Sequence, residues 1–184
     1  MKTKIFFTVI LISLSFSIKA QWQQVYNDGT VVFITANDSV IIANSLGTLL
    51  ISKGNDAIWE ETIPCYFCSF FFPSFIISGS KIVACNDDGI FLTNDYGQHW
   101  DTVSNGFPQY NQFYSLAAID TNYFAATYKG LYQSSGNCNY WSQINNGLPN
   151  TSYISVTVKG SLIFAGAKGK GIYLSSDNGN TWAP

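Results

Sequence analysis

The sequence predicts an all-β protein built from four copies of one small sheet, arranged as a β-propeller. Three observations predict this class: tryptophans recur at a fixed interval, short β-rich runs alternate with glycine-containing turns, and no segment keeps an apolar period of 3.6 residues. The composition agrees, because 16% of the 184 residues are aromatic and only 11% are charged. Low charge together with 47% hydrophobic residues excludes intrinsic disorder.

Residues 1–20 have the pattern of a secretory signal peptide. Lys2 and Lys4 form a charged start, an apolar run follows, and Ala20 offers a small residue at the expected cleavage point. The apolar run is shorter than the roughly 20 residues that a membrane-spanning helix needs. We therefore expect a cleaved leader, with residues 21–184 exported as one propeller domain to the periplasm, the cell surface or the medium, and no integral membrane segment after cleavage.

The exported part of the chain is acidic. Without the leader it keeps six lysines against eleven acidic residues, a net charge of −5, and the whole sequence contains no arginine. An acidic surface without arginine argues against nucleic acid and other polyanions as partners.

A repeat of 41 residues organises this domain. Its units end at tryptophans that lie 41 residues apart: Trp59, Trp100, Trp141 and Trp182. Seven positions before each tryptophan stands a small hydroxyl residue: Ser52, Thr93, Ser134 and Ser175. Columns held in register over this distance indicate one structural unit copied four times.

The last unit shows the strands that we expect in every copy. Residues 153–158 alternate in polarity, residues 162–165 and 172–174 are short apolar runs, and Trp182 opens a fourth strand. The earlier units predict matching strands at 82–84, 90–92, 123–125 and 131–133. Four strands in about 40 residues is the size of a propeller blade.

The third strand of each unit explains why the units should stack. It is apolar in two adjacent columns: Leu49, Ile90, Leu131 and Ile172 in one, and Leu50, Phe91, Tyr132 and Tyr173 in the other. Adjacent residues of a strand point to opposite faces, so this strand needs cover on both sides. Blades stacked around an axis provide that cover.

The length leaves two ways to complete the array. Residues 21–184 equal four repeat lengths, and Trp22–Val25 form an isolated fourth strand that could pair into the last blade and close a four-bladed ring. The alternatives are a fragment of a larger propeller and an open arc that self-association could complete.

The turns before two of the tryptophans share a motif. They read Thr93-Asn94-Asp95-Tyr96-Gly97-Gln98-His99-Trp100 and Ser175-Ser176-Asp177-Asn178-Gly179-Asn180-Thr181-Trp182. In such a turn the carboxylate accepts backbone N–H groups, the glycine supplies a positive φ, and the tryptophan fills the wedge between blades. This motif resembles the Asp-box, S-x-D-x-G-x-x-W, of the bacterial neuraminidase repeat (BNR) propellers, a family that includes sialidases, sortilin-like receptors and photosystem assembly factors.

Only two of the four boxes are intact. The first unit has Gly54 and Asp56 where the motif has aspartate and glycine, and the third has Gly136 and Cys138. The resemblance implies that the box residues are structural and lie on the face opposite the ligand site. They are Thr93, Asp95, Gly97, Trp100, Ser175, Asp177, Gly179 and Trp182.

Catalysis is the less favoured function. Sialidases of the resembled family hold the substrate carboxylate with three arginines, and this chain has none, which argues against sialidase activity. A glycoside hydrolase or lyase domain is the alternative, and its two carboxylates would come from Asp87 and Asp88 or from Glu60 and Glu61. The single histidine, His99, lies inside a box and suggests no catalytic triad.

The four cysteines favour structural disulfides. Cys65, Cys68, Cys85 and Cys138 form an even set in an exported chain, which predicts one or two disulfides of undetermined pairing. The Cys65–Cys68 spacing lacks the helix that lowers a redox thiol's pKa, and zinc would need two further ligands. We expect no cofactor and no metal.

The aromatic stretch Cys68–Ile77 has two interpretations. It aligns with the first strand of the second unit, so core filling is the default, and an exposed aromatic platform for a sugar or a partner is the alternative.

The favoured function is a non-enzymatic binding or scaffolding module for a glycan or an extracellular protein, and a purely architectural array is a third hypothesis. In propellers, the loops that follow the second and fourth strands gather on one face. Candidate contact residues in those loops are Tyr66, Asp87, Asp88, Tyr110, Tyr128, Lys129, Lys168 and Lys170. The tyrosines would stack on a sugar or peptide, and the charged groups would set its orientation.

Overall fold

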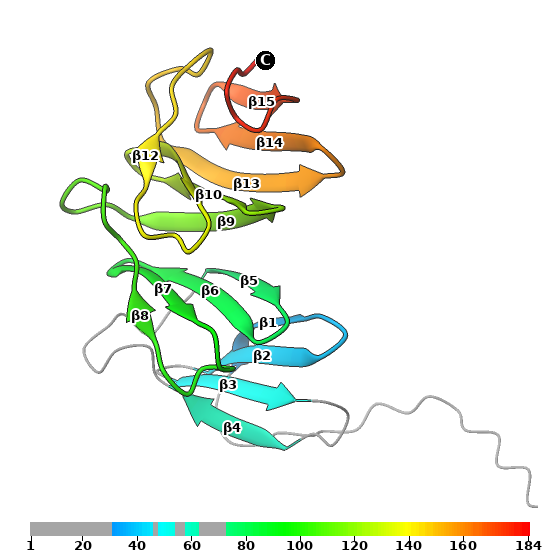
Figure 1. The fold of residues 1–184 in the computed structure, drawn as a ribbon. Coiled ribbons are helices and arrows are strands. Elements are labelled where there is room, and N and C mark those ends of the chain that lie inside the picture. The colour runs from blue at the N-terminus through cyan, green and yellow to red at the C-terminus, as the bar shows by residue number, and fades with distance from the viewer. Residues whose placement is uncertain (1–30, 46–47, 54–57, 63–72) are drawn as a thin grey trace, which may run out of the picture.

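The computed structural model of the chain consists of four antiparallel sheets that follow one another along an arc (Figure 1). The structure describes residues 31–45, 48–53, 58–62 and 73–184. Within these residues there is no helix, and therefore no helix that is long and apolar enough to cross a membrane. The prediction of an all-β chain with one sheet per repeat is confirmed.

Each sheet contains its strands in chain order. The first sheet comprises β1 (Val31–Ala36), β2 (Val40–Ser45), β3 (Thr48–Lys53) and β4 (Trp59–Thr62). The second comprises β5 (Ser74–Ser78), β6 (Lys81–Asn86), β7 (Gly89–Thr93) and β8 (Asp101–Thr102). The third comprises β9 (Phe113–Ile119), β10 (Asn122–Thr127), β11 (Gly130–Ser135) and β12 (Ser142–Gln143). The fourth comprises β13 (Tyr153–Lys159), β14 (Leu162–Ala167) and β15 (Gly171–Ser175).

The repeated tryptophans mark where each fourth strand begins. Trp59 is the first residue of β4, and Trp100 and Trp141 directly precede β8 and β12. In the last unit Trp182 precedes Ala183, which forms an isolated bridge with Leu174 of β15. The predicted position of the tryptophan at the opening of the fourth strand is therefore confirmed in the first three units. The expectation of four strands in every unit is wrong for the last one, whose sheet has three strands and only this bridge at the fourth position.

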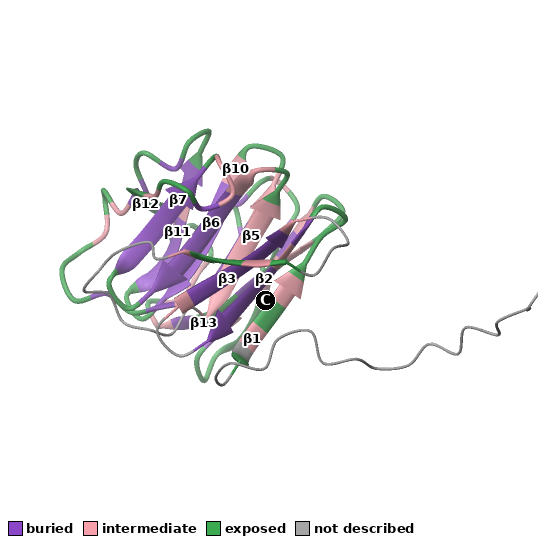
Figure 2. Cartoon of the chain, turned by 90° about the horizontal axis from the view of Figure 1, so that it is seen from below, coloured by how far each residue is buried: buried purple, intermediate pink, exposed green. Residues whose placement is uncertain are grey.

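The core lies between neighbouring sheets. Leu49, Ile90 and Leu131 of the third strands are each at most 1% exposed. Trp141 is fully buried between the second and third sheets, and its indole N–H donates to the carbonyl of Val103 at 2.8 Å. In Figure 2 the residues of β2, β3, β6 and β7 are mostly buried, whereas β1 at one end of the array is largely half-buried or exposed.

The arc is open, with the first and last sheets at its two ends (Figure 1). Ile172, which shares the column of Leu49, Ile90 and Leu131, is 67% exposed. The expectation that every third strand is covered on both sides is therefore wrong for β15, because none of the described sheets packs on that side of it. The segment Trp22–Val25, which we expected as a closing strand, lies outside the described residues.

Two of the four cysteines form no disulfide, so the expectation of disulfides is wrong for these two. Cys85 on β6 and Cys138 in the loop after β11 are both free and fully buried. Both belong to the apolar core between the second and third sheets, where they act as small hydrophobic side chains. Cys65 and Cys68 lie outside the described residues.

The described part of the aromatic stretch supports core filling. Phe75, Ile76 and Ile77 of β5 are half-buried, and the Phe75 ring stacks on Phe33 of β1 at a centroid distance of 5.5 Å. The residues before Pro73 lie outside the described part of the chain.

Candidate functional site

A pocket of about 320 Å³ lies between the second and third sheets, beside the β6–β7 turn and the β8–β9 loop. Its lining residues are Asp87, Asp88, Gly89, Ser104, Phe107, Pro108, Gln109, Tyr110, Asn111 and Phe113. Three of the candidate contact residues, Asp87, Asp88 and Tyr110, are therefore brought together around one cavity. Both segments were predicted to lie on the same face of the array.

The β6–β7 turn presents the two carboxylates. The buried Asn86 side chain accepts the backbone N–H of Asp88 at 2.8 Å and that of Gly89 at 3.2 Å, which holds the turn tight. The backbone of Gly89 has φ 155°, and a Cβ there would lie 2.4 Å from the Ser104 hydroxyl. The turn and the β8–β9 loop are thus in close contact, and Asp87 and Asp88 remain exposed at the rim of the pocket.

The apolar wall of the pocket is formed by aromatic rings that pack on one another. The Phe107 ring packs edge-on against Phe113 at 4.8 Å, and lies 4.6 Å from Tyr132 and 5.3 Å from Trp141, measured between ring centroids. Two residues before Phe107, the backbone carbonyl of Asn105 accepts the backbone N–H of Trp141 at 2.8 Å. The repeated tryptophan of the third unit therefore fixes the loop that shapes the pocket.

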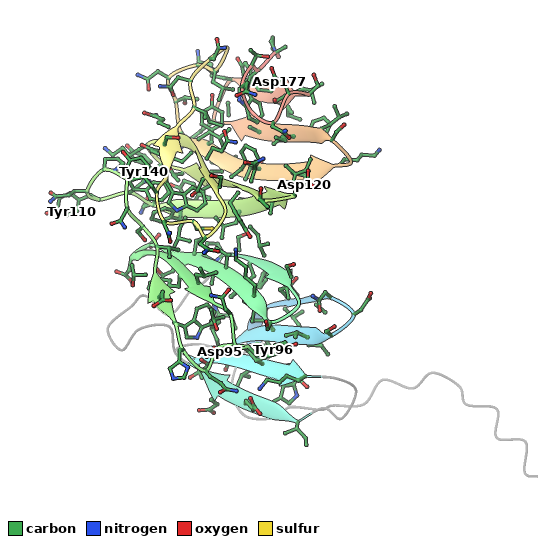
Figure 3. All side chains as sticks on the ribbon, viewed as in Figure 1. Asp95, Tyr96, Tyr110, Asp120, Tyr140 and Asp177 are labelled. Carbon is green, nitrogen blue, oxygen red and sulfur yellow. The ribbon has the colours of Figure 1, made fainter. Side chains whose placement is uncertain are left out.

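Tyr110 stands at the outer rim. Its side chain is 93% exposed and its φ is +57°, a left-handed conformation that turns the loop outward. In Figure 3 it projects away from the sheets, on the opposite side of the array from Asp120 in the β9–β10 turn. A ring with this exposure is available for stacking.

The next turn along this face is joined to the pocket. Asn111 is buried, and its side-chain carbonyl accepts the backbone N–H of Lys129 at 3.2 Å. The backbone N–H of Tyr128 donates to the carbonyl of Gln112 at 2.9 Å. These contacts place Tyr128 and Lys129 beside the pocket, with the Lys129 ammonium 5.3 Å from the centroid of the Tyr128 ring.

The remaining candidate residues lie further along the face. Lys168 and Lys170 are exposed in the β14–β15 turn, where the backbone N–H of Lys168 donates to the carbonyl of Ser152 at 2.9 Å. This contact repeats, one unit later, the one between Tyr128 and Gln112. Neither lysine lines the pocket, and Tyr66 lies outside the described residues.

The chemistry of the lining is acidic and aromatic. Two carboxylates, two amides, a hydroxyl and aromatic rings line the cavity, and no lysine does. Such a lining suits a ligand with a cationic or hydrogen-bonding group and an apolar surface. Throughout residues 31–45, 48–53, 58–62 and 73–184, no three His, Cys, Asp or Glu side chains are placed to hold a metal ion.

The two intact box turns lie at the other end of the third strands. In the second unit the Asp95 carboxylate accepts the Thr93 hydroxyl at 2.7 Å and the backbone N–H of His99 at 2.9 Å, and the Thr93 hydroxyl accepts the backbone N–H of Gly97 at 2.9 Å. In the fourth unit Ser175, Asp177, Gly179 and Thr181 form the same bonds at 2.8, 2.9 and 2.9 Å. Both turns use their carboxylate internally.

These internal bonds lower the pKa of both carboxyl groups. The backbone N–H and side chain of His99, together with the Thr93 hydroxyl, hold the pKa of Asp95 well below its usual value. The hydroxyl and backbone N–H of Thr181 and the Ser175 hydroxyl lower the pKa of Asp177. Asp95 and Asp177, labelled in Figure 3, form turns. Neither of them lines the pocket beside Asp87 and Asp88.

The glycines of the boxes pack against the preceding sheet. A Cβ on Gly97 would lie 2.8 Å from Cδ1 of Ile51 in the first sheet, and one on Gly179 would lie 2.8 Å from Phe124 in the third. Trp100 reaches the same neighbour, since its indole N–H donates to Thr62 Oγ1 at 2.9 Å. Trp182 is buried, and its indole N–H donates to the carbonyl of Gly179 at 3.0 Å.

Sequence reasoning missed several residues of the pocket. Phe107 and Asn111 were within a loop that we expected to face the ligand, but neither was singled out. The Phe107-Pro108 pair in an otherwise polar loop was the signal that could have identified the apolar wall. The position of Asn111 offered no such signal, because its partner Lys129 is 18 residues away.

No family model and no curated protein matches the chain. Solved structures do match. PorZ, a bacterial surface component of the type-IX secretion system of Porphyromonas gingivalis, matches with a TM-score of 0.68 and 12% identity over 86% of this chain and 22% of its own. YCF48 from Cyanidioschyzon merolae matches with a TM-score of 0.61 and 12% identity over 85% and 59%. The GH74 xyloglucanase from Xanthomonas campestris matches with a TM-score of 0.61 and 16% identity over 79% and 28%.

These three are β-propeller proteins, so the likeness shows that the sheets have the propeller type of fold. At such low identity it shows the fold alone. The chain spans less than two thirds of the length of each of these three structures.

Proposed function

We propose that the chain is an exported, non-enzymatic binding module of the Asp-box propeller type. Its ligand, an extracellular protein or a glycan, binds the face formed by the β6–β7 turn, the β8–β9 loop and the β10–β11 turn. The observation that carries this proposal is the pocket in which Asp87, Asp88 and Tyr110 converge beside Tyr128 and Lys129.

The Asp-box assignment draws support from the two intact turns. The motif in the sequence and the bonds of Asp95 and Asp177 agree on one structural task, which is to close the turn and pack it on the preceding sheet. Export draws support from the leader-like pattern of residues 1–20. Because these carboxylates are bonded within their own turns, the ligand is proposed to bind on the opposite face.

The lining favours a peptide that carries an amine or guanidinium group. Asp87 and Asp88 would hold the cation, and the exposed Tyr110 ring would stack on it or on a neighbouring side chain. YCF48, one of the structural neighbours, has been solved bound to the D1 peptide, which supports peptide binding as a use of this fold. A neutral glycan would use the same ring with hydrogen bonds from Gln109 and Ser104.

A binding screen tests this function. Arrays of lysine-rich, neutral and glutamate-rich peptides, together with a glycan array, would be probed with the purified chain. We expect retention of basic peptides, with an affinity that falls about 10-fold or more in Asp87→Asn, Asp88→Asn and Tyr110→Ala. Tyr140→Ala is the matched control, because Tyr140 is 67% exposed and lies outside the pocket. Equal retention by all four variants would refute the proposed site.

A glycoside hydrolase-like domain is the second candidate. It is favoured by the presence of two carboxylates in one pocket and by GH74 enzymes among the neighbours. Xyloglucan and other β-glucans would be incubated with the chain and their reducing ends measured. Turnover that disappears in both Asp87→Asn and Asp88→Asn would favour the enzyme, and no turnover with intact ligand binding would favour the binding module.

A further inference from the structure

A second cavity, of about 370 Å³, lies at the opposite end of the β10–β11 hairpin from the candidate pocket. Thr127 and Gly130 pair at the pocket end of this hairpin, and Asn122 and Ser135 pair about 17 Å away along the strands. The second cavity is lined by Asn122, Gln133, Ser134, Ser135, Tyr140 and Ser142, which we call the hydroxyl–amide site. The two cavities share no lining residue, so each can take a ligand of its own.

The third sheet brings four of these side chains to one surface. Gln133 of β11 pairs with Ser142 of β12. Asn122 of β10 pairs with Ser135 of β11. Paired residues of neighbouring strands, and residues two apart on one strand, project on the same face of a sheet. Gln133 also pairs with Phe124, which is buried against the fourth sheet, so this surface is the side of the third sheet that faces the fourth.

Tyr140 adds an exposed ring on a fixed backbone. The side chain, labelled in Figure 3, is 67% exposed. The Ser134 hydroxyl donates to the backbone carbonyl of Tyr140 at 2.6 Å. The next residue, Trp141, is buried, and its backbone N–H donates to the carbonyl of Asn105 at 2.8 Å. Because the main chain is held on both sides of the ring, stacking on Tyr140 requires little further ordering of the backbone.

The third unit differs from its neighbours in the charge of this surface. Where Ser142 stands, the first two units have Glu60 and Asp101. Where Asn122 stands, the second unit has Lys81. Among the described residues, those that line the cavity include no charged side chain. The surface thus keeps its hydrogen-bonding groups and loses the charges that the preceding units carry.

Gln133 departs from its column in the same direction. The other three units have an apolar residue at this position: Ile51, Leu92 and Leu174. The Gln133 amide is held in place, since its Nε2 donates to the carbonyl of Asn178 in the box turn of the fourth unit at 3.2 Å. An amide in an otherwise apolar column indicates that this unit uses the position for polar recognition.

This lining selects the chemistry of its ligand. Amide and hydroxyl groups both donate and accept hydrogen bonds, as the hydroxyl groups of a sugar do. The Tyr140 ring offers a flat apolar surface that matches the C–H face of a pyranose ring. A charged ligand would lose hydration and meet no opposite charge in the lining. We propose that the hydroxyl–amide site binds a neutral saccharide, with one pyranose ring stacked on Tyr140 and its hydroxyl groups bonded to Gln133 and Ser142.

Sugar titration tests the site. The purified chain would be titrated with cellohexaose, maltohexaose and mannohexaose, and with a hexamer of galacturonic acid, by calorimetry and two-dimensional NMR. We expect a neutral hexasaccharide to bind more tightly than the acidic hexamer, and Tyr140→Ala to raise its Kd about 10-fold or more. Gln133→Leu, which introduces the residue of the second and fourth units, should weaken binding in the same direction while thermal unfolding shows the variant folded.

Tyr110→Ala is the matched control, because Tyr110 is an exposed ring that lines the other cavity. It should leave the sugar affinity unchanged, whereas in the peptide screen Tyr110→Ala weakens binding and Tyr140→Ala does not, so the two sites can fail separately. Sugar affinity that falls in Tyr110→Ala and is kept in Tyr140→Ala would assign the sugar to the other cavity and overturn this proposal. Tighter binding of the galacturonic acid hexamer, or no binding of any neutral hexasaccharide at millimolar concentration, would overturn it as well.

Discussion

The backbone of Gly106 lies directly on the backbone of Trp141. A Cβ on Gly106 would come 2.0 Å from the carbonyl oxygen of Trp141, and the residue has φ +99°. The relationship recurs one unit later, where a Cβ on Gly147 would come 2.0 Å from the carbonyl oxygen of Trp182. In these two cases the main chain of the repeated tryptophan therefore contacts the start of the loop that leads to its own sheet.

This contact predicts a large effect of Gly106→Ala. The new methyl group must displace the Trp141 carbonyl and adopt an unfavourable φ, so we expect the free energy of unfolding to fall by about 2–4 kcal/mol, measured by urea denaturation. Gly136→Ala is the matched control: its φ is +63° but a Cβ there meets nothing within 4 Å. It should cost only the strain, about 1–2 kcal/mol. Equal losses in the two variants would show that the close approach to Trp141 contributes nothing.

The carboxyl groups of the intact boxes predict a pH dependence. The folded-state pKa of Asp95 is lowered, and an unfolded aspartate has a pKa of about 3.9. The stabilisation is therefore fully present above this unfolded value and is lost as the pH falls toward the folded pKa. We expect Asp95→Asn to lower the urea midpoint at pH 7, with the difference from the unaltered chain shrinking between about pH 5 and pH 2.

Asp177 provides an internal comparison for that experiment. Its pKa is lowered by Thr181 and Ser175, and no histidine takes part. Asp177→Asn should show the same direction with pH, which separates the turn bonds from the contact between Asp95 and the His99 ring at 2.6 Å. A difference in midpoint that stays constant from pH 7 to pH 2 in both variants would contradict the role given to these carboxylates.

The buried cysteines predict slow alkylation. Burial raises the pKa of the Cys85 thiol far above its usual value and raises that of Cys138 to about 11. At pH 8 almost no thiolate forms at either position, and no reagent has access to them. Mass spectrometry of peptides should find both thiols unmodified after brief treatment of the folded chain with iodoacetamide, and both modified in urea. A thiol that stays unmodified in urea and becomes modified only after treatment with dithiothreitol would reveal a disulfide.

The sequence was sufficient to predict the sheets because the repeat restates each element four times. Strand 153–158 was readable by its alternation, and its counterparts followed from the 41-residue register that Trp141 and Trp182 set. The pairing of Thr93 with Asp95 was also readable, since a hydroxyl and a carboxylate two residues apart bond within a turn without help from distant residues.

The predictions that were wrong or incomplete concern residues whose environment is set by neighbours distant in the sequence. Ile172 has the same apolar character as Leu131, and its exposure depends on whether another sheet packs on that side of β15. Cys138 stands in the third unit at the position that Gly97 has in the second, and that position is buried. Cys138 is therefore a packing residue, although the expected export of the chain favoured a disulfide. The pocket shows the same limit, because Asn111 is held by the β10–β11 turn, 18 residues away in the sequence.

Asn111 allows a prediction in which two effects nearly cancel. Its side-chain carbonyl accepts the Lys129 N–H, but its Nδ2 is buried without a hydrogen-bond partner. Asn111→Ala removes a bond worth about 1 kcal/mol and also removes a desolvation cost of similar size. We therefore expect the free energy of unfolding to change by less than about 1 kcal/mol.

The local consequence should be larger than the global one. The Lys129 N–H keeps only the Thr127 hydroxyl as acceptor, at 3.2 Å, so the β10–β11 turn opens more often. Hydrogen exchange at the amides of Tyr128 and Lys129 should accelerate about 3- to 10-fold, while the amide of Lys168, held by Ser152 in the next unit, stays unchanged. Because the same turn borders the proposed ligand pocket, a variant that exchanges faster there without losing global stability should also bind ligand more weakly. Unchanged exchange at Lys129 would show that Asn111 does not hold this turn.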